Sequence, residues 1–200
     1  GMGVLVFVLA LSQELPDRSI HIMRAEMPGP IVDKLVPKAR DTAKILYSMY
    51  FVLTLAEVIF LLVGGMNLYD SIIHSFSTAG TGGFSSRNSS VAFYDSAYID
   101  GVITVFMILF GINFNMYYLL LLKKVKDVFK NEEVRAYLGV ILGATLLITI
   151  NILSMYEKPL KAFRYAVFQV ASIITTTGFV TADFNLWPMF SQCILLGLMV

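Results

Sequence analysis

The chain has 200 residues, of which 57% are hydrophobic and only 14% are charged. Soluble domains usually carry about 45–50% apolar and about 25% charged residues, so this composition, with a mean hydropathy of +0.74, is typical of a membrane protein. The 15 basic and 14 acidic side chains nearly cancel, which argues against a surface that binds nucleic acid. One cysteine and two widely separated histidines exclude a disulfide framework and disfavour hydrolytic zinc chemistry.

The first part of the chain predicts a helix end followed by a linker. Residues 1–11 are apolar but too few to cross a bilayer, which takes roughly 20 residues, so we expect the end of a transmembrane helix of a preceding repeat. Residues 12–41 are rich in basic residues and prolines, and prolines interrupt any long helix there. We expect a cytoplasmic linker.

Three windows are long and apolar enough to span a membrane, and they lie at residues 45–63, 101–122 and 134–155. Between them lie two apolar stretches too short to cross, 69–79 and 162–174. Each is followed by a run rich in glycine and threonine. Such a short helix with a Gly/Thr run predicts a re-entrant pore loop, and an amphipathic surface helix in an ordinary outer loop is the alternative.

The basic residues orient these segments. Eleven of the 15 Lys and Arg side chains lie in residues 18–44 and 123–135, and by the positive-inside rule these two segments face the cytoplasm. Both Gly/Thr runs then face the outside.

The chain also repeats itself. A shift of 95 residues lays Gly83 on Gly178, Phe84 on Phe179 and Thr81 on Thr176, and the order of predicted elements coincides. We therefore predict an all-α polytopic membrane protein of helix–pore-loop–helix repeats in parallel orientation, related by pseudo-symmetry about the membrane normal as in potassium channels. Residues 42–122 form one complete repeat, 123–132 a cytoplasmic loop, and 133–200 the next repeat, cut short in its last helix.

The Gly/Thr runs have the chemistry of a cation filter. Backbone carbonyls from several segments can replace the water around a cation, and glycine permits the backbone angles that this arrangement requires. The predicted filter residues are Thr81, Gly82, Gly83, Thr176, Thr177 and Gly178. For either run alone, a plain turn or a β-prone patch is the competing interpretation.

Four further residues are candidates for a pore or cavity lining. Glu57 lies in the middle of a span, where a carboxylate is costly without a partner, so it is either functional or a hydrogen-bonded packing residue. Gly111, Asn113 and Asn115 interrupt the next span and either line an inner cavity or join helices to one another. His74 is expected to brace its short helix, and Asp70, Asp95, Asp100 and Asp183 are expected at the outer face, where they attract cations or are simply solvated.

The stretches HSFSTAGTGGFSSRNSS (74–90), ASIITTTGFVTADF (171–184) and HIMRAEMPGP (21–30) resemble the membrane subunit of the Trk/Ktr/HKT potassium-transporter superfamily, closest to the bacterial TrkH type. The resemblance covers essentially the whole chain. It implies four repeats in one chain, each giving one quarter of a potassium filter centred on a glycine, here Gly83 and Gly178.

The resemblance also implies potassium as the transported ion, with no organic cofactor. It implies a multi-pass protein in the bacterial inner membrane, a homodimer, and a cytosolic nucleotide-binding regulatory subunit of the TrkA/KtrA type. Neither run has the full Thr-Val-Gly-Tyr-Gly of tetrameric potassium channels, so we expect a shorter and less discriminating filter.

Two other function classes remain for comparison. A secondary transporter, such as a symporter with re-entrant substrate-binding loops, predicts inverted rather than parallel repeats. An intramembrane enzyme is disfavoured because the spans lack paired acids, a Ser/His pair and metal-ligand spacing.

Overall fold

The structure, a computed structural model, describes residues 39–113, 116–117, 119, 131–156 and 158–199. Within them the chain is helical and has no strand, which confirms the all-α prediction. The linker expected at 12–41 falls mostly outside these residues, and the helix end at 1–11 and the candidate Asn115 entirely outside. The α-helices are α3 (Ala39–Val63), α4 (Leu68–Ala79), α5 (Ala97–Gly111), α8 (Glu132–Ile152), α9 (Pro159–Ile174) and α10 (Met189–Leu198), with 3-10 turns η1 (Ser90–Tyr94), η2 (Leu153–Met155) and η3 (Phe184–Leu186).

Local sequence signals set where the helices begin. The side chain of Asn67 accepts a hydrogen bond from the backbone N–H of Asp70 at 2.7 Å and caps α4. Asn131 caps α8 in the same way, accepting from the N–H of Glu133 at 2.9 Å. Pro159 occupies the first turn of α9, where its missing N–H costs nothing. The short helix predicted at 162–174 therefore begins three residues earlier and ends as expected.

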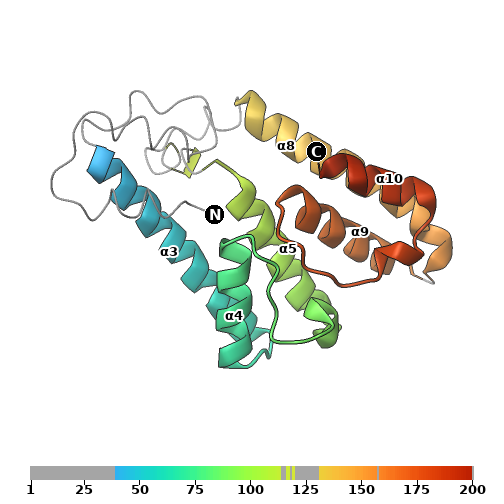
Figure 1. Cartoon of the computed structure of the whole chain (residues 1–200), viewed down its shortest axis with the longest axis horizontal. Coiled ribbons are helices and arrows are strands. Elements are labelled where there is room, and N and C mark those ends of the chain that lie inside the picture. The colour runs from blue at the N-terminus through green and yellow to red at the C-terminus, as the bar shows by residue number, and fades with distance from the viewer. Residues whose placement is uncertain (1–38, 114–115, 118, 120–130, 157, 200) are drawn as a thin grey trace.

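The helices fall into two similar groups (Figure 1). In the first group α3 packs against α4 and both contact α5, and in the second α8 packs against α9 and both contact α10. The groups meet where α5 packs against α9, and Figure 1 shows α5 between α4 and α9. The order of a long helix, a short helix and a second apolar helix is thus the same in both groups.

Two helical segments, Lys44–Val63 and Glu132–Met155, are long and apolar enough to cross a membrane. Only 22% and 28% of their apolar windows are buried inside the chain. The core helix of a soluble protein would be mostly buried, so these helices have the exposed apolar surface that lipid or further transmembrane helices would cover.

The window 101–122, predicted to span the membrane, is not one continuous helix, because α5 ends at Gly111 and Ile112 has extended backbone. Two tyrosine hydroxyls compensate for the break. Tyr117 donates a hydrogen bond to the carbonyl of Leu109 at 2.6 Å, and Tyr137 of α8 donates to the carbonyl of Ile108 at 3.3 Å. The Leu109 carbonyl also accepts from the N–H of Ile112 at 3.1 Å, so the hydroxyls supply additional donors to the last carbonyls of α5, where the helical hydrogen bonds end.

The two groups share a hydrophobic core. Ile103 and Met107 of α5 pack with Phe168 of α9 and with Phe179, and all four side chains are almost completely buried. A second core lies within the later group, around Ile148 of α8 and Ala166 of α9. The shared core fixes the position of one Gly/Thr run relative to the other.

We predict a large difference between two isoleucines of α8. Ile148 is completely buried and Ile150 is 67% exposed. Ile148→Ala should lower the free energy of unfolding of the full-length protein by about 2–4 kcal/mol, because it leaves a cavity. Ile150→Ala should change it by less than about 0.5 kcal/mol. Thermal or denaturant unfolding in detergent measures both, and equal losses would contradict the packing described here.

Candidate functional site

The two Gly/Thr runs have the same unusual backbone. Thr81 and Gly83 have φ of 50° and 65°, and Thr176 and Gly178 have φ of 57° and 86°. The matching residues are 95 positions apart, as the sequence repeat requires. Threonine is β-branched and rarely adopts a positive φ, because its Cβ approaches the following carbonyl. Positive φ therefore occurs at the same two positions of both runs. Such strained backbone persists only where the surrounding structure maintains it.

The backbone hydrogen bonds of the two runs also correspond. Three successive N–H groups bond back to carbonyls at the end of the preceding short helix. Before and within the first run, the N–H groups of Gly80, Thr81 and Gly82 donate at 2.8, 3.1 and 2.8 Å. At the second run those of Thr175, Thr176 and Thr177 donate at 3.1, 2.9 and 2.9 Å, and that of Gly178 adds a bond at 3.2 Å. The donors of each run therefore point toward its own helix.

The acceptors of the runs are used differently from the donors. Within the part of the chain that the structure describes, the carbonyl oxygens of Gly82, Gly83, Thr177 and Gly178 accept no hydrogen bond. Gly82 and Gly178 are exposed, Gly83 is partly buried, and only Thr177 is buried. The carbonyl oxygens are therefore available to water or to a cation. Each short helix also directs its C-terminal end, which carries partial negative charge, at its run.

The two runs touch one another at Gly83. A Cβ atom built there would overlap the carbonyl oxygen of Thr177 and would lie 3.2 Å from the carbonyl carbon of Gly178. Both the positive φ and this contact exclude any side chain at Gly83. At Gly178 the φ is positive too, but a Cβ atom would meet nothing within 4 Å in the described structure.

The exit of the second run is held by hydroxyl and backbone groups. The Ser172 hydroxyl donates to the carbonyl of Phe179 at 2.7 Å. The N–H of Val180 donates to the hydroxyl of Ser90 at 3.3 Å, and the carbonyl of Val180 accepts from the N–H of Ala92 at 3.1 Å. Since Ser90 and Ala92 belong to η1, the first repeat supports the second run.

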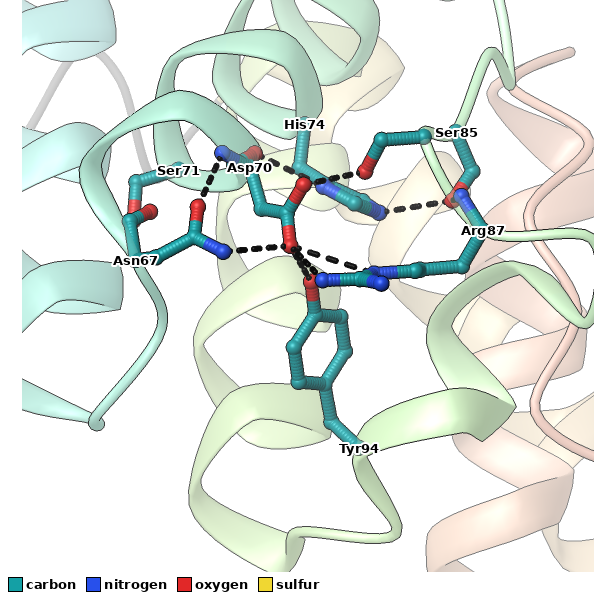
Figure 2. A network of polar contacts seen from close by, with 8 residues as sticks. Asn67, Asp70, Ser71, His74, Ser85, Arg87 and Tyr94 are labelled. Carbon is teal, nitrogen blue, oxygen red and sulfur yellow. Dashed lines mark hydrogen bonds and ion pairs between the residues drawn. The ribbon is translucent and has the colours of Figure 1, made fainter.

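Around the exit of the first run, Asp70 is the centre of a polar cluster (Figure 2). Its carboxylate accepts hydrogen bonds from Ser86, from Arg87 at 2.9 Å, from Tyr94 at 2.6 Å and from Asn67 at 3.0 Å. The hydrogen bonds from Ser86, Tyr94 and Arg87 hold the pKa of Asp70 well below its usual value, although burial opposes them. Asp70 is 1% exposed, so the expectation of a carboxylate open to the outer face is wrong for it.

The other acidic candidates differ from Asp70 and from one another. Asp95 has a 72% exposed side chain and pairs with Arg164 at 3.0 Å, as expected of an outer-face residue. Asp100 is buried beside the same arginine, with a 3.3 Å separation. Asp183 caps η3 by accepting from the N–H of Asn185. Burial of Asp70 and Asp100 depends on partners far along the chain, which composition does not reveal.

His74 braces α4, as expected, through contacts with residues that follow each run. Its Nδ1 is 2.7 Å from the carbonyl oxygen of Asp70, and its Nε2 is 3.0 Å from the hydroxyl of Ser85. Burial lowers the pKa of His74, so the ring is neutral at pH 7 and Nδ1, which faces a carbonyl, carries the proton. The ring stacks on Phe179 with centroids 5.6 Å apart.

The remaining candidates lie on the inner side of the runs or within the helices. Gly111 adjoins the second run, since a Cβ there would lie 3.0 Å from Cγ2 of Thr175 and would overlap the hydroxyl of Tyr137. Asn113 is buried just after the end of α5. Glu57 is completely buried in α3, and its carboxyl oxygens have no hydrogen-bond partner among the described residues.

Sequence reasoning missed the Asp70 cluster and the tyrosines at the break in α5. One signal was present for Asp70: it follows Asn67 by three residues, a spacing close to that of a capping box. The tyrosines carry no comparable signal, because their roles depend on where α5 ends.

Comparison with known proteins identifies the family. The family model described as TrkH, cation transport protein, matches residues 1–200. Relatives include the Trk system potassium uptake protein TrkH of Salmonella typhimurium, 36% identical over 98% of this chain and 41% of the relative, and TrkG of Escherichia coli, 30% identical over the same shares. The crystal structure of the potassium transporter TrkH from Vibrio parahaemolyticus superposes with a TM-score of 0.80 at 29% identity, covering 97% of this chain and 40% of that one.

The fold is therefore that of an α-helical membrane protein, and the family model that matches it is described as a cation transport protein. This protein belongs to the TrkH family, which confirms the resemblance stated from the sequence. The chain spans about 41% of the length of the relatives it matches. The description of the family model, a cation transport protein, names a non-enzymatic class.

We predict that Asp70→Asn destabilises the protein in a pH-dependent way. The loss at neutral pH should be about 2 kcal/mol, below the 3–5 kcal/mol typical of a broken buried pair because the Arg87 side chain is 37% exposed. Since the folded pKa of Asp70 is lowered, its contribution is complete above pH 4 or so and disappears as the pH falls further. Thermal unfolding between pH 7 and pH 3 should show the two proteins converging in acid, and a constant difference would contradict the assignment.

Proposed function

We propose that this chain contributes two of the four segments of a potassium-selective filter in a potassium-uptake protein. The ligands are backbone carbonyls of Thr81, Gly82 and Gly83 from one loop and Thr176, Thr177 and Gly178 from the next. The observation that carries the proposal is the duplicated run, with left-handed residues at its first and third positions and its N–H groups bonded back to the short helix.

The chemistry follows from this backbone. A potassium ion that leaves water needs oxygen ligands to replace its hydration shell, and neutral carbonyls supply them without binding the ion too tightly to leave. Most N–H groups of the runs, those of Thr81, Gly82, Thr176, Thr177 and Gly178, are bonded to the preceding helix, so the carbonyls are the groups left for the ion. The C-terminal ends of α4 and α9 add partial negative charge on the same side.

Two further segments are needed to complete the ring of ligands. The contact of Gly83 with the run that follows it has no counterpart at Gly178, where the space for a Cβ is open in the described structure. By the 95-residue repeat, the run of a further repeat occupies that space in the full-length protein. We propose that the relatives' additional length supplies this repeat and an earlier one.

The inner side of the filter and the partners follow from the family. We propose that Gly111, Asn113 and Asn115 line the cavity below the filter and that Glu57 supports this cavity. The contact that supports this proposal is that of Gly111 with Thr175.

We also propose a homodimer in the bacterial inner membrane, regulated by a cytosolic nucleotide-binding subunit of the TrkA/KtrA type at the basic cytoplasmic segments. A coupled carrier, or symporter, is the competing function, and the parallel orientation of the repeats disfavours it.

The test is rubidium uptake, driven by a potassium gradient, into liposomes that hold the full-length protein, with sodium as competitor. Gly83→Ser and Gly178→Ser should each lower the preference for rubidium over sodium by at least about tenfold, which corresponds to about 1.4 kcal/mol. The reason is that a side chain at either position displaces the carbonyls.

Gly139→Ser is the matched control. Gly139 lies in α8, has no positive φ, and has open space where a Cβ would be. The Gly139→Ser variant should prefer rubidium over sodium as strongly as the wild type does. Uptake indifferent to Gly83 and Gly178 would make the runs structural turns and favour the carrier.

A further inference from the structure

The first run is tied at both ends to one short helix. Its beginning bonds to the C-terminal turn of α4, as described above. Its exit, residues 85–87, bonds to the N-terminal half of α4: Ser85 to the ring of His74 at 3.0 Å, and Ser86 and Arg87 to the carboxylate of Asp70. Figure 2 shows Arg87 from the loop, Asn67 from the start of α4 and Tyr94 from η1 converging on the carboxylate of Asp70. The position of the run therefore depends on this cluster.

The carboxylate of Asp70 is fully used by its protein partners. Oδ1 accepts from the hydroxyl of Ser86, and Oδ2 accepts from the guanidinium of Arg87, the hydroxyl of Tyr94 and the amide of Asn67. The residue is 1% exposed. A carboxylate with its lone pairs occupied and no access to solvent is not arranged to attract ions to the pore mouth. Its contacts fit the positioning of the loop instead.

The second loop lacks this cluster. Shifted by 95 residues, Asp70 corresponds to Tyr165, His74 to Gln169 and Arg87 to Ala182. The second run nevertheless has positive φ at the same two positions and the corresponding N–H hydrogen bonds to its preceding helix. The carboxylate cluster is thus not required to form a loop of this kind, and its presence in the first loop calls for a separate explanation.

The cluster also reaches the second run. The ring of His74 stacks on Phe179, with an interplanar angle of 27°, and Phe179 directly follows Gly178. Tyr94, which donates to Asp70, lies in η1, and η1 bonds to Val180 through Ser90 and Ala92. A change in the position of Asp70's partners is therefore transmitted to both runs.

We infer that Asp70, with Arg87, Tyr94 and His74, is a positioning cluster that fixes the spacing of the two runs and so sets how well the pore discriminates potassium and rubidium from sodium. The inference rests on the proposed function of the runs as filter segments. Discrimination against a smaller ion requires carbonyls that do not close in around it, whether by cavity size or by the number and strength of the dipoles. Loosening the exit of the first run lets its carbonyls approach sodium.

The test measures uptake of rubidium and of sodium separately, by the full-length protein in liposomes and per folded molecule. Asp70→Asn, which keeps the shape and removes the charge, should lower the rubidium-to-sodium ratio by about tenfold, mainly by increasing sodium uptake. Tyr94→Phe removes one hydroxyl and keeps the carboxylate with its arginine, and should lower the ratio by about threefold.

Asp95→Asn is the matched control. It makes the same change of charge at the same outer face and breaks an arginine pair, with Arg164, but Asp95 makes no bond to residues 81–87. The rubidium-to-sodium ratio of Asp95→Asn should remain that of the wild type. This result separates the loss of loop positioning from the loss of negative charge at the pore mouth.

The outcomes separate the alternatives. If Asp70→Asn and Tyr94→Phe lower the uptake of both ions equally, the cluster is only a structural support and the inference is overturned. If Asp70→Asn does not fold, the ratio for Tyr94→Phe decides, and an unchanged ratio overturns the inference. A Gly83→Ser variant belongs in the same experiment. If Gly83→Ser also leaves the rubidium-to-sodium ratio unchanged, the proposed filter fails. If Gly83→Ser lowers the ratio and the cluster variants do not, only the inference about the cluster fails.

Discussion

The contact of Gly83 with the backbone of Thr177 and Gly178 is the constraint on which the rest of the structure depends. It brings two loops, 95 residues apart in sequence, so close that a single methyl group at Gly83 would overlap a carbonyl oxygen. The positive φ there already favours glycine, and the contact makes glycine necessary. The shared core of α5 and α9 and the bonds from η1 to Val180 hold the loops at this separation.

The two loops reach the same backbone by different means. The first is held by a charged cluster around Asp70, and the second by the hydroxyl of Ser172 and by bonds from the first repeat. Two loops with different supports share this backbone, which indicates that the backbone of the run is the common requirement.

The sequence predicted the helices, both short helices and the 95-residue correspondence, because these depend on local hydropathy and on glycine and threonine at repeated spacing. It did not predict the break in α5, since the stability of that break depends on tyrosine hydroxyls brought in from elsewhere. Nor did the sequence predict the burial of Asp70. Its carboxylate bonds to four side chains, and three of them, Ser86, Arg87 and Tyr94, follow it by 16 to 24 residues. The roles of the predicted filter residues remain a proposal.

The most direct measurement is the structure of the full-length protein in rubidium, with the anomalous signal of the ion located in the map. The account predicts rubidium on a common axis within coordinating distance of carbonyl oxygens of residues 81–83 and 176–178, and loss of that signal when rubidium is replaced by sodium. Rubidium bound elsewhere, with water or side chains in front of these carbonyls, would contradict it.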